Sequence, residues 1–84
     1  YPNPFNPTTK FVVSVPQTVK VELIVYDILG RKVKTLLNEE RTAGYHTVEW
    51  NGLNESNAQV ATGVYFVRMS SDKFTAVRKI MMMK

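Results

Sequence analysis

Segments in which apolar residues occupy every second position dominate this sequence. From Val19 to Val25 the odd positions are apolar, and Lys20 and Glu22 lie between them, as in a strand with one solvent-facing side. Glycine, proline or asparagine interrupts the chain every ~8–12 residues, the spacing typical of all-β sandwiches. An apolar spacing of three and four, which an amphipathic helix requires, nowhere outcompetes the alternation. The sequence therefore predicts an all-β fold, an antiparallel β-sandwich of about seven strands.

Turn-forming residues divide the chain into candidate strands, which we expect at residues 11–15, 19–26, 31–37, 45–50, 64–70 and 73–83. The alternation breaks at Ile24 and Tyr26, so this part of the strand should be covered on both faces. Asp27 can cap a tight turn locally, and Gly30 supplies the positive φ that such a turn needs. Further turns are expected at residues 43–44, 51–52 and 71–72. The predicted core includes Leu23, Val25, Val48, Trp50, Tyr65, Val67 and Ile80.

The last expected strand has two candidate buried faces. One parity holds Phe74, Ala76, Arg78, Ile80 and Met82, and the other holds Val77, Lys79, Met81 and Met83. Each parity carries both apolar side chains and a cation, so the alternation leaves both faces open. A bulge or an edge position would reconcile the pattern with a sandwich.

Length and composition indicate one domain, because 84 residues are too few for two. There is no cysteine, which excludes disulfides and thiolate metal sites. Residues 1–9 hold three of the four prolines and should form an extended or turning segment ahead of a sandwich spanning residues 10–84. The first residue is Tyr1, so we interpret the chain as part of a longer polypeptide. No membrane-spanning segment is expected, because the longest apolar run, Ile80 to Met83, is far shorter than the ~20 residues needed.

The charge balance favours charged side chains spread over a solvated surface and not a concentrated electrostatic binding site. Lysine and arginine outnumber aspartate and glutamate by 11 to 7, but the cations are dispersed along the chain. Aromatic and basic residues interleave only faintly, as in Phe66 with Arg68 and Phe74 with Arg78. A nucleic-acid partner is therefore not expected.

Catalytic chemistry finds little support among the residue types present. His46 is the only histidine and lies inside a predicted strand, where a packing role is more common than catalysis. The acidic residues lie mostly at turns or on solvent-facing positions, unlike the paired carboxylates of a glycosidase cleft. No glycine-rich phosphate loop precedes a helix. The sequence predicts neither an enzyme nor a cofactor.

The sequence contains residues that could build two kinds of binding site. Calcium prefers several carboxylates, and the oxygen-rich loop contains only one, which favours a plain loop without metal: Asn51, Asn54, Glu55, Ser56 and Asn57. An exposed aromatic platform would suit a carbohydrate-binding module, with Tyr45, Trp50, Tyr65 and Phe66 available. A single tryptophan in so small a domain is more often part of its core, so we expect Trp50 to be buried.

Several motifs occur in order along the whole chain: YPNPFNPTT at residues 1–9, VYDILGRKV at 25–33, AGYH at 43–46, WNG at 50–52, TGVYF at 62–66 and RKIMMMK at 78–84. In combination they resemble the type A carboxy-terminal sorting domain of the type IX secretion system. The resemblance implies an immunoglobulin-like sandwich that ends a secreted protein and acts as a non-catalytic export signal. A run of methionines replaces the branched apolar residues common near the end of that family.

What the resemblance implies about partners follows from that role. The partners would be the outer-membrane secretion machinery, a sortase-like peptidase and an N-terminally fused cargo domain. The protein would reach the outside or the cell surface of a Gram-negative bacterium through the periplasm. Carried over by motif, the residues for translocon recognition are Gly63, Tyr65, Phe66, Lys79, Ile80, Met82 and Lys84.

Two alternatives belong to other functional classes. The tyrosine–aspartate and glycine–valine–tyrosine motifs are also similar to those of the immunoglobulin-like module of flagellar hook-capping proteins, which would make the domain a structural part of an assembly. An accessory carbohydrate-binding module of a secreted hydrolase is the other alternative, and it would bind a polysaccharide.

Overall fold

The computed structural model describes residues 8–72 and 74–83, and it confirms an all-β fold. Within these residues six strands are formed, one fewer than the approximate number expected: β1 (Thr9–Val15), β2 (Val19–Tyr26), β3 (Lys32–Arg41), β4 (Gly44–Trp50), β5 (Gly63–Ser70) and β6 (Thr75–Met82). An isolated bridge between Leu53 and Gln59 adds a short antiparallel contact inside the loop before β5. The anchors expected at Tyr1 and Phe5 lie outside the described residues. No helix in the described part of the chain is long and apolar enough to span a membrane.

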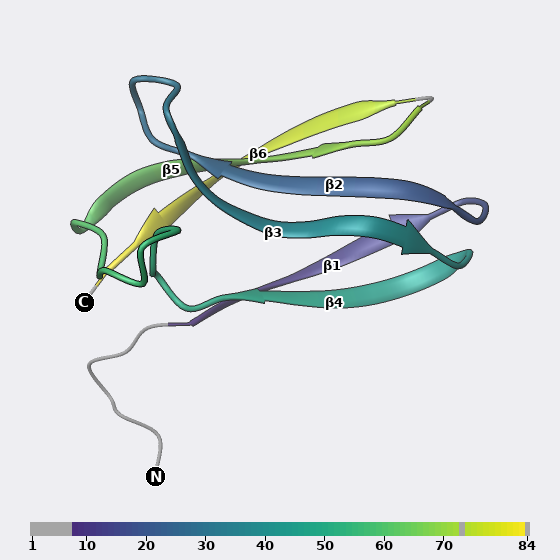
Figure 1. Ribbon diagram of the computed structural model, residues 1–84, viewed down its shortest axis with the longest axis horizontal. Coiled ribbons are helices and arrows are strands. Elements are labelled where there is room, and N and C mark those ends of the chain that lie inside the picture. The colour runs from purple at the N-terminus through teal and green to yellow at the C-terminus, as the bar shows by residue number, and fades with distance from the viewer. Residues whose placement is uncertain (1–7, 73, 84) are drawn as a thin grey trace, which may run out of the picture.

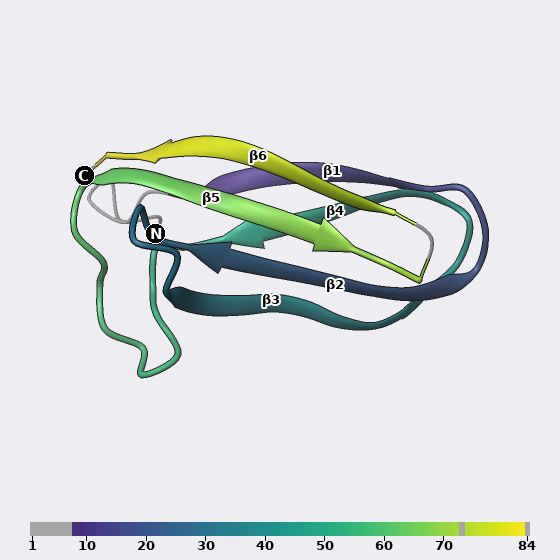
Figure 2. The ribbon, with the colours of Figure 1, turned by 90° about the horizontal axis from the view of Figure 1, so that it is seen from above.

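The strands form two layers in which each pair is antiparallel. One layer contains β1 and β4, and the other has the order β3–β2–β5–β6. In Figure 1 the four-stranded sheet lies above the pair β1 and β4, and Figure 2 shows the same layers from above. The links β1–β2 and β3–β4 each carry the chain from one sheet to the other at the right-hand end of Figure 1. The opposite end collects the β2–β3 turn, the β4–β5 loop and the end of β6.

The core lies between these layers because both sheets direct one parity of their strands inward. In β2 the alternation places Val21, Leu23 and Val25 in the interior with at most 2% of their surface exposed. In β1 every second residue from Phe11 to Val15 is buried in the same way. The whole buried cluster comprises Phe11, Val13, Val15, Val21, Leu23, Val25, Leu37, Trp50, Tyr65, Val67 and Met82.

The predicted core is confirmed at five positions: Leu23, Val25, Trp50, Tyr65 and Val67. Val48 and Ile80 are half-buried and pack against this cluster. Of the six members that were not predicted, three lie in β1, and the others are Val21, Leu37 and Met82. Phe11, Val13 and Val15 carry a regular alternation, so they could have been chosen from the pattern.

β3 extends four residues past the predicted end at Leu37, to Arg41. Its polar residues 38–41 pair through the backbone with residues 19–22 of β2, and their side chains are mostly exposed. The sequence predicted that the strand ends at Leu37 because alternation of apolar and polar residues reflects side-chain burial. An edge strand needs only backbone hydrogen bonds to one neighbour, so polar residues can continue it.

The two candidate faces of the last strand are decided by its end. Met82 is 2% exposed and Ile80 is half-buried, whereas Val77 and Met81 are 61% and 58% exposed. The parity of Ile80 and Met82 therefore faces the core. β6 pairs only with β5, and this edge position allows its first half to stay exposed on both sides.

Adjacent valines in β1 provide a matched test of the layers. Val13 is 5% exposed and Val12 is 64% exposed. We expect Val13→Ala to lower the free energy of unfolding by about 1.5–3 kcal/mol, because two buried methyl groups are lost and a cavity is left. Val12→Ala should change it by less than about 0.5 kcal/mol. Urea unfolding of both variants measures this, and equal effects would contradict the inward orientation of Val13.

Candidate functional site

The residues that the sequence singled out for recognition gather on β5 and β6. Three pairs are in register: Gly63 with Met82, Tyr65 with Ile80, and Phe66 with Lys79. The structure therefore brings six of the seven predicted residues together, and Lys84 lies outside the described residues.

These six residues divide between the two faces of the sheet. Tyr65 and Met82 are buried in the core and Ile80 packs against it, whereas Phe66 is half-buried and Lys79 is exposed. Gly63 begins β5 with a φ of 156°, a conformation that other residues rarely adopt. Packing explains the inward members, and a recognition role for the seven stays a prediction.

Tyr65 and Trp50 form the centre of this end of the sandwich. Their ring centroids lie 5.2 Å apart at an interplanar angle of 71°, an edge-to-face contact. The Tyr65 hydroxyl donates to the Ala61 carbonyl at 2.6 Å, and the Trp50 indole N–H donates to the Leu53 carbonyl at 3.0 Å. Both rings thus hold the β4–β5 loop while they fill the core.

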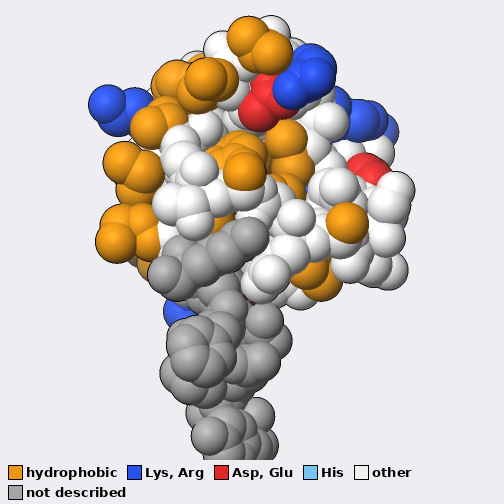
Figure 3. Space-filling model, turned by 90° about the vertical axis from the view of Figure 1, so that its left-hand side faces the viewer, with side chains coloured by type: hydrophobic (Ala, Val, Ile, Leu, Met, Phe, Trp, Pro, Cys, Tyr) orange, Lys and Arg blue, Asp and Glu red, His pale blue; other side chains and the backbone are white. Residues whose placement is uncertain are grey.

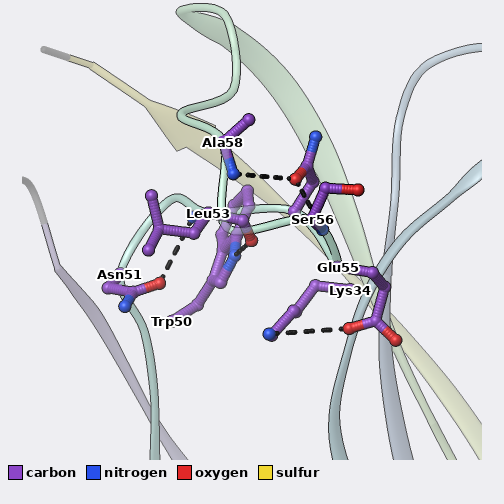
Figure 4. A network of polar contacts seen from close by, with 8 residues as sticks. Lys34, Trp50, Asn51, Leu53, Glu55, Ser56 and Ala58 are labelled. Atoms are coloured by element: carbon purple, nitrogen blue, oxygen red, sulfur yellow. Dashed lines mark hydrogen bonds and ion pairs between the residues drawn. The ribbon is translucent and has the colours of Figure 1, made fainter.

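The β4–β5 loop uses its side-chain oxygens internally. The Asn54 side chain accepts from the backbone N–H groups of Ser56 and Ala58 at 2.9 and 3.0 Å, and Asn51 accepts from Leu53 at 3.2 Å. Figure 4 shows Glu55 directed toward Lys34, with 3.5 Å between the carboxylate and ammonium groups. Among residues 8–72 and 74–83, no group of three or more His, Cys, Asp or Glu side chains could hold a metal ion. The loop is therefore built by asparagine caps and one ion pair.

The β2–β3 turn has the form predicted from its sequence. The Asp27 carboxylate accepts from the backbone N–H groups of Leu29 and Arg31, both at 2.9 Å, and from the Arg31 side chain at 2.8 Å. Gly30 closes the turn with a φ of 81° and donates to the Asp27 carbonyl at 3.0 Å. The Arg31 backbone bond is the main cause that lowers the pKa of Asp27, and the Arg31 side chain and Leu29 N–H contribute to it.

His46 has a structural partner. It is half-buried in β4, and its Nε2 lies 2.7 Å from the Thr42 carbonyl, which requires the tautomer with a proton on Nε2. The bond ties β4 to the link that precedes it. This agrees with the packing role predicted for His46.

On the other side of the four-stranded sheet, Arg68 lies over Tyr26. The guanidinium carbon is 5.0 Å from the ring centroid, and Nη2 donates to the Tyr26 hydroxyl at 2.7 Å. From the sequence, Tyr26 was noted only because it breaks the alternation of apolar residues. Arg68 was noted only for its place two residues after Phe66. The strand register that joins Tyr26 to Phe66, and Ile24 to Arg68, is the signal that was missing.

Comparison with known proteins places this geometry in a family. Residues 3–73 match the family described as the FlgD Ig-like domain, which is well over half of the chain. The chain belongs to this family. No curated protein matches the sequence of this chain.

A solved structure shares the fold of this FlgD Ig-like domain. The crystal structure of FlgD from P. aeruginosa superimposes with a TM-score of 0.71 at 24% sequence identity. The similarity covers 87% of the chain described here and 60% of the P. aeruginosa chain. The likeness establishes the immunoglobulin-like fold.

The main functional prediction from the sequence is wrong. The family match and the structural likeness point to the FlgD Ig-like domain and not to a type IX sorting domain, so they favour the first of the two alternatives. The motifs that carried the resemblance include the Asp27 turn and the β5 strand, which build the sandwich in this FlgD Ig-like domain as well. The expected cell-surface location stays a prediction.

The geometry also weakens the carbohydrate-binding alternative. Trp50 is 1% exposed and Tyr65 is 7% exposed, so neither ring can stack on a sugar. Tyr45 is 80% exposed, but it lies on β4, in the opposite sheet from Phe66 on β5. The four aromatic residues therefore form no common platform.

The burial of Tyr65 predicts a loss of stability in alkali. Burial, together with the charge of Asp27, raises the pKa of Tyr65, so the folded state keeps the proton that the unfolded chain releases above about pH 10. The free energy of unfolding should therefore fall as the pH rises above that value. Tyr65→Phe should remove this dependence and, at neutral pH, cost about 1 kcal/mol through the lost bond to Ala61. Urea unfolding from pH 7 to 11 measures both effects, with the exposed Tyr45→Phe as the matched control.

The Asp27 turn predicts the opposite dependence in acid. Because the folded state lowers the pKa of Asp27, its contribution is complete above the unfolded value of about 3.9 and is lost as the pH falls through the folded value. Asp27→Asn keeps the acceptor oxygen but has no such titration, so its unfolding free energy should vary less between pH 5 and 2. Asp72→Asn, in an exposed turn, controls for the change in net charge. Identical acid profiles for Asp27→Asn and the unmodified chain would contradict the assigned role.

Proposed function

We propose that this chain is a non-catalytic, structural module of the flagellar hook-capping type, which works through protein–protein contacts inside an assembly. The observation that carries the proposal is the family match over residues 3–73. The fold shared with FlgD of P. aeruginosa supports it. The likeness covers 60% of that solved chain, so the rest of a hook-capping protein would supply other contacts.

The chemistry of the described residues is consistent with a scaffold. The two groups with shifted pKa values, Asp27 and Tyr65, form hydrogen bonds with the backbone of adjacent turns and loops. His46 bonds a backbone carbonyl instead of a nucleophile or an acid. A module of this kind offers a partner a rigid surface and well-defined strand ends.

Removal of the module from its parent protein tests the proposal. Deletion of residues 10–84 in the bacterium that encodes the protein should stop completion of the flagellar hook, because the assembly would lose one of its contact surfaces. Electron microscopy of the cell surface and swimming assays measure the outcome. A deletion strain that holds the shortened protein at normal levels and still builds normal hooks would contradict the proposal.

A further inference from the structure

The outer face of the four-stranded sheet, which points away from β1 and β4, carries two ordered rows of side chains. Because antiparallel partners project to the same face, the register builds these rows across the strands. The first row is Lys32, Tyr26, Phe66 and Lys79, and the second is Ile24, Arg68 and Val77. Val64 and Met81 form a further pair that projects to the same face of the sheet.

This half of the face, next to the β2–β3 turn, is basic and apolar. We call it the basic–aromatic surface: Ile24, Tyr26, Lys32, Val64, Phe66, Arg68, Val77, Lys79 and Met81. The other half, toward the β5–β6 hairpin, is polar and holds Lys20, Glu22, Glu40, Ser70 and Asp72 around a shallow hollow. Charge and apolar character are therefore segregated along the strands, unlike a uniformly solvated sheet face.

The basic–aromatic surface is hollowed where the turn meets the sheet. A depression of about 360 Å³ is lined by Tyr26, Asp27, Ile28, Phe66, Arg68 and Val77. The turn adds Ile28 and Leu29, which are 70% and 72% exposed. Figure 3 shows hydrophobic side chains gathered along the top and the left of this end of the molecule. Exposed aliphatic side chains beside an aromatic ring and an arginine match the composition of protein interfaces.

The cations of this surface have no acidic partner of their own. In the part of the chain that the structure describes, the ion pairs engage Lys10, Arg31, Lys34 and Arg41, and not Lys32, Arg68 or Lys79. Asp27 also lines the hollow, but Arg31 already binds its carboxylate at 2.8 Å. Lys32, Arg68 and Lys79 thus flank a hollow whose lining carboxylate, Asp27, is already paired with Arg31.

Arg68 is held in place before any partner arrives. Its contacts with the Tyr26 ring and hydroxyl fix the guanidinium above the sheet and use one of its five N–H donors. The remaining donors can form a bidentate pair with a carboxylate. Because the side chain is already ordered, a partner would lose less conformational entropy on binding it.

We propose that the basic–aromatic surface docks an acidic, partly apolar segment of a protein partner. Carboxylates of that segment pair with Lys32, Arg68 and Lys79, and its apolar side chains enter the hollow between Phe66 and Val77. This inference rests on the proposed function and names the surface through which the module contacts its assembly.

Two other occupants fit the surface less well. A single-stranded nucleic acid needs free aromatic faces for stacking, and Arg68 already covers the Tyr26 ring. A second copy related by a two-fold axis through this surface would bring the cations Lys32, Arg68 and Lys79 of both copies together, and like charges repel. An acidic and apolar protein segment satisfies both the charges and the hollow.

Binding of synthetic peptides to the full 84-residue chain tests the proposal. One peptide alternates glutamate with leucine, and the other replaces each glutamate with lysine. In nuclear magnetic resonance titrations, the acidic peptide should shift the amide signals of Tyr26, Phe66, Arg68 and Val77, and the basic peptide should not.

A charge-reversed pair of variants then assigns the contact. Lys32→Glu combined with Lys79→Glu leaves the Arg68–Tyr26 contact intact and should weaken binding of the acidic peptide about tenfold, because two attractions become repulsions. Lys10→Glu combined with Lys20→Glu makes the same change in net charge away from the surface and should leave the affinity within about twofold. Thermal unfolding of both double variants checks that each is folded.

Four results would overturn the inference: equal affinity for both peptides, signal shifts confined to other surfaces, equal weakening by both double variants, or tighter binding of a polythymidine oligonucleotide or of phosphatidylglycerol vesicles. The deletion experiment separates these results from failure of the proposed function. If the deletion stops hook completion but the Lys32 and Lys79 reversal alters neither peptide binding nor the hooks, the surface is wrong and the function stands. If the deletion leaves hooks normal, the proposed function fails whatever the peptides bind.

Discussion

The edge-to-face contact of Trp50 with Tyr65 joins the two layers of the sandwich at one end. Trp50 is the last residue of β4 in the two-stranded sheet, and Tyr65 lies in β5 of the four-stranded sheet, with 5.2 Å between the rings. Each ring also bonds a carbonyl of the loop that connects their strands. A chain without cysteine has no disulfide between its sheets, so the packing of large buried side chains of this kind holds them together.

The core covers only the inner face of the four-stranded sheet, and its outer face remains free to contact a partner. β2 occupies the middle of the sandwich, with Val21, Leu23 and Val25 directed into the core, and its other parity directs Ile24 and Tyr26 outward. Ile24 is nevertheless only 6% exposed, because its neighbours on β3 and β5 cover it. Water is thus already excluded from Ile24 in the middle of the outer face, while the residues around it stay accessible.

The motifs by which the chain resembles a sorting domain are motifs of the fold. The Asp27–Gly30 turn and the Gly63–Phe66 strand are needed for folding, since one closes a hairpin and the other inserts Tyr65 into the core. Motifs with such roles recur wherever the same sandwich is used, so they report the fold far more strongly than the function. The family match over residues 3–73 was needed to choose between two families that share them.

The alternation of apolar residues predicted the strands, and Asp27 with Gly30 predicted the turn, because both signals depend on residues a few positions apart. The size and apolar character of Trp50 predicted its burial. The three-dimensional structure was needed to show which parity of β6 is buried, why β3 continues to Arg41, and which side chains share the outer face. Those features depend on the register between strands that are distant in sequence, such as the pairing of Ile24 with Arg68 and of Arg68 with Val77. Cross-strand register follows from the packing of the whole core, and a local alternation of residues does not contain it.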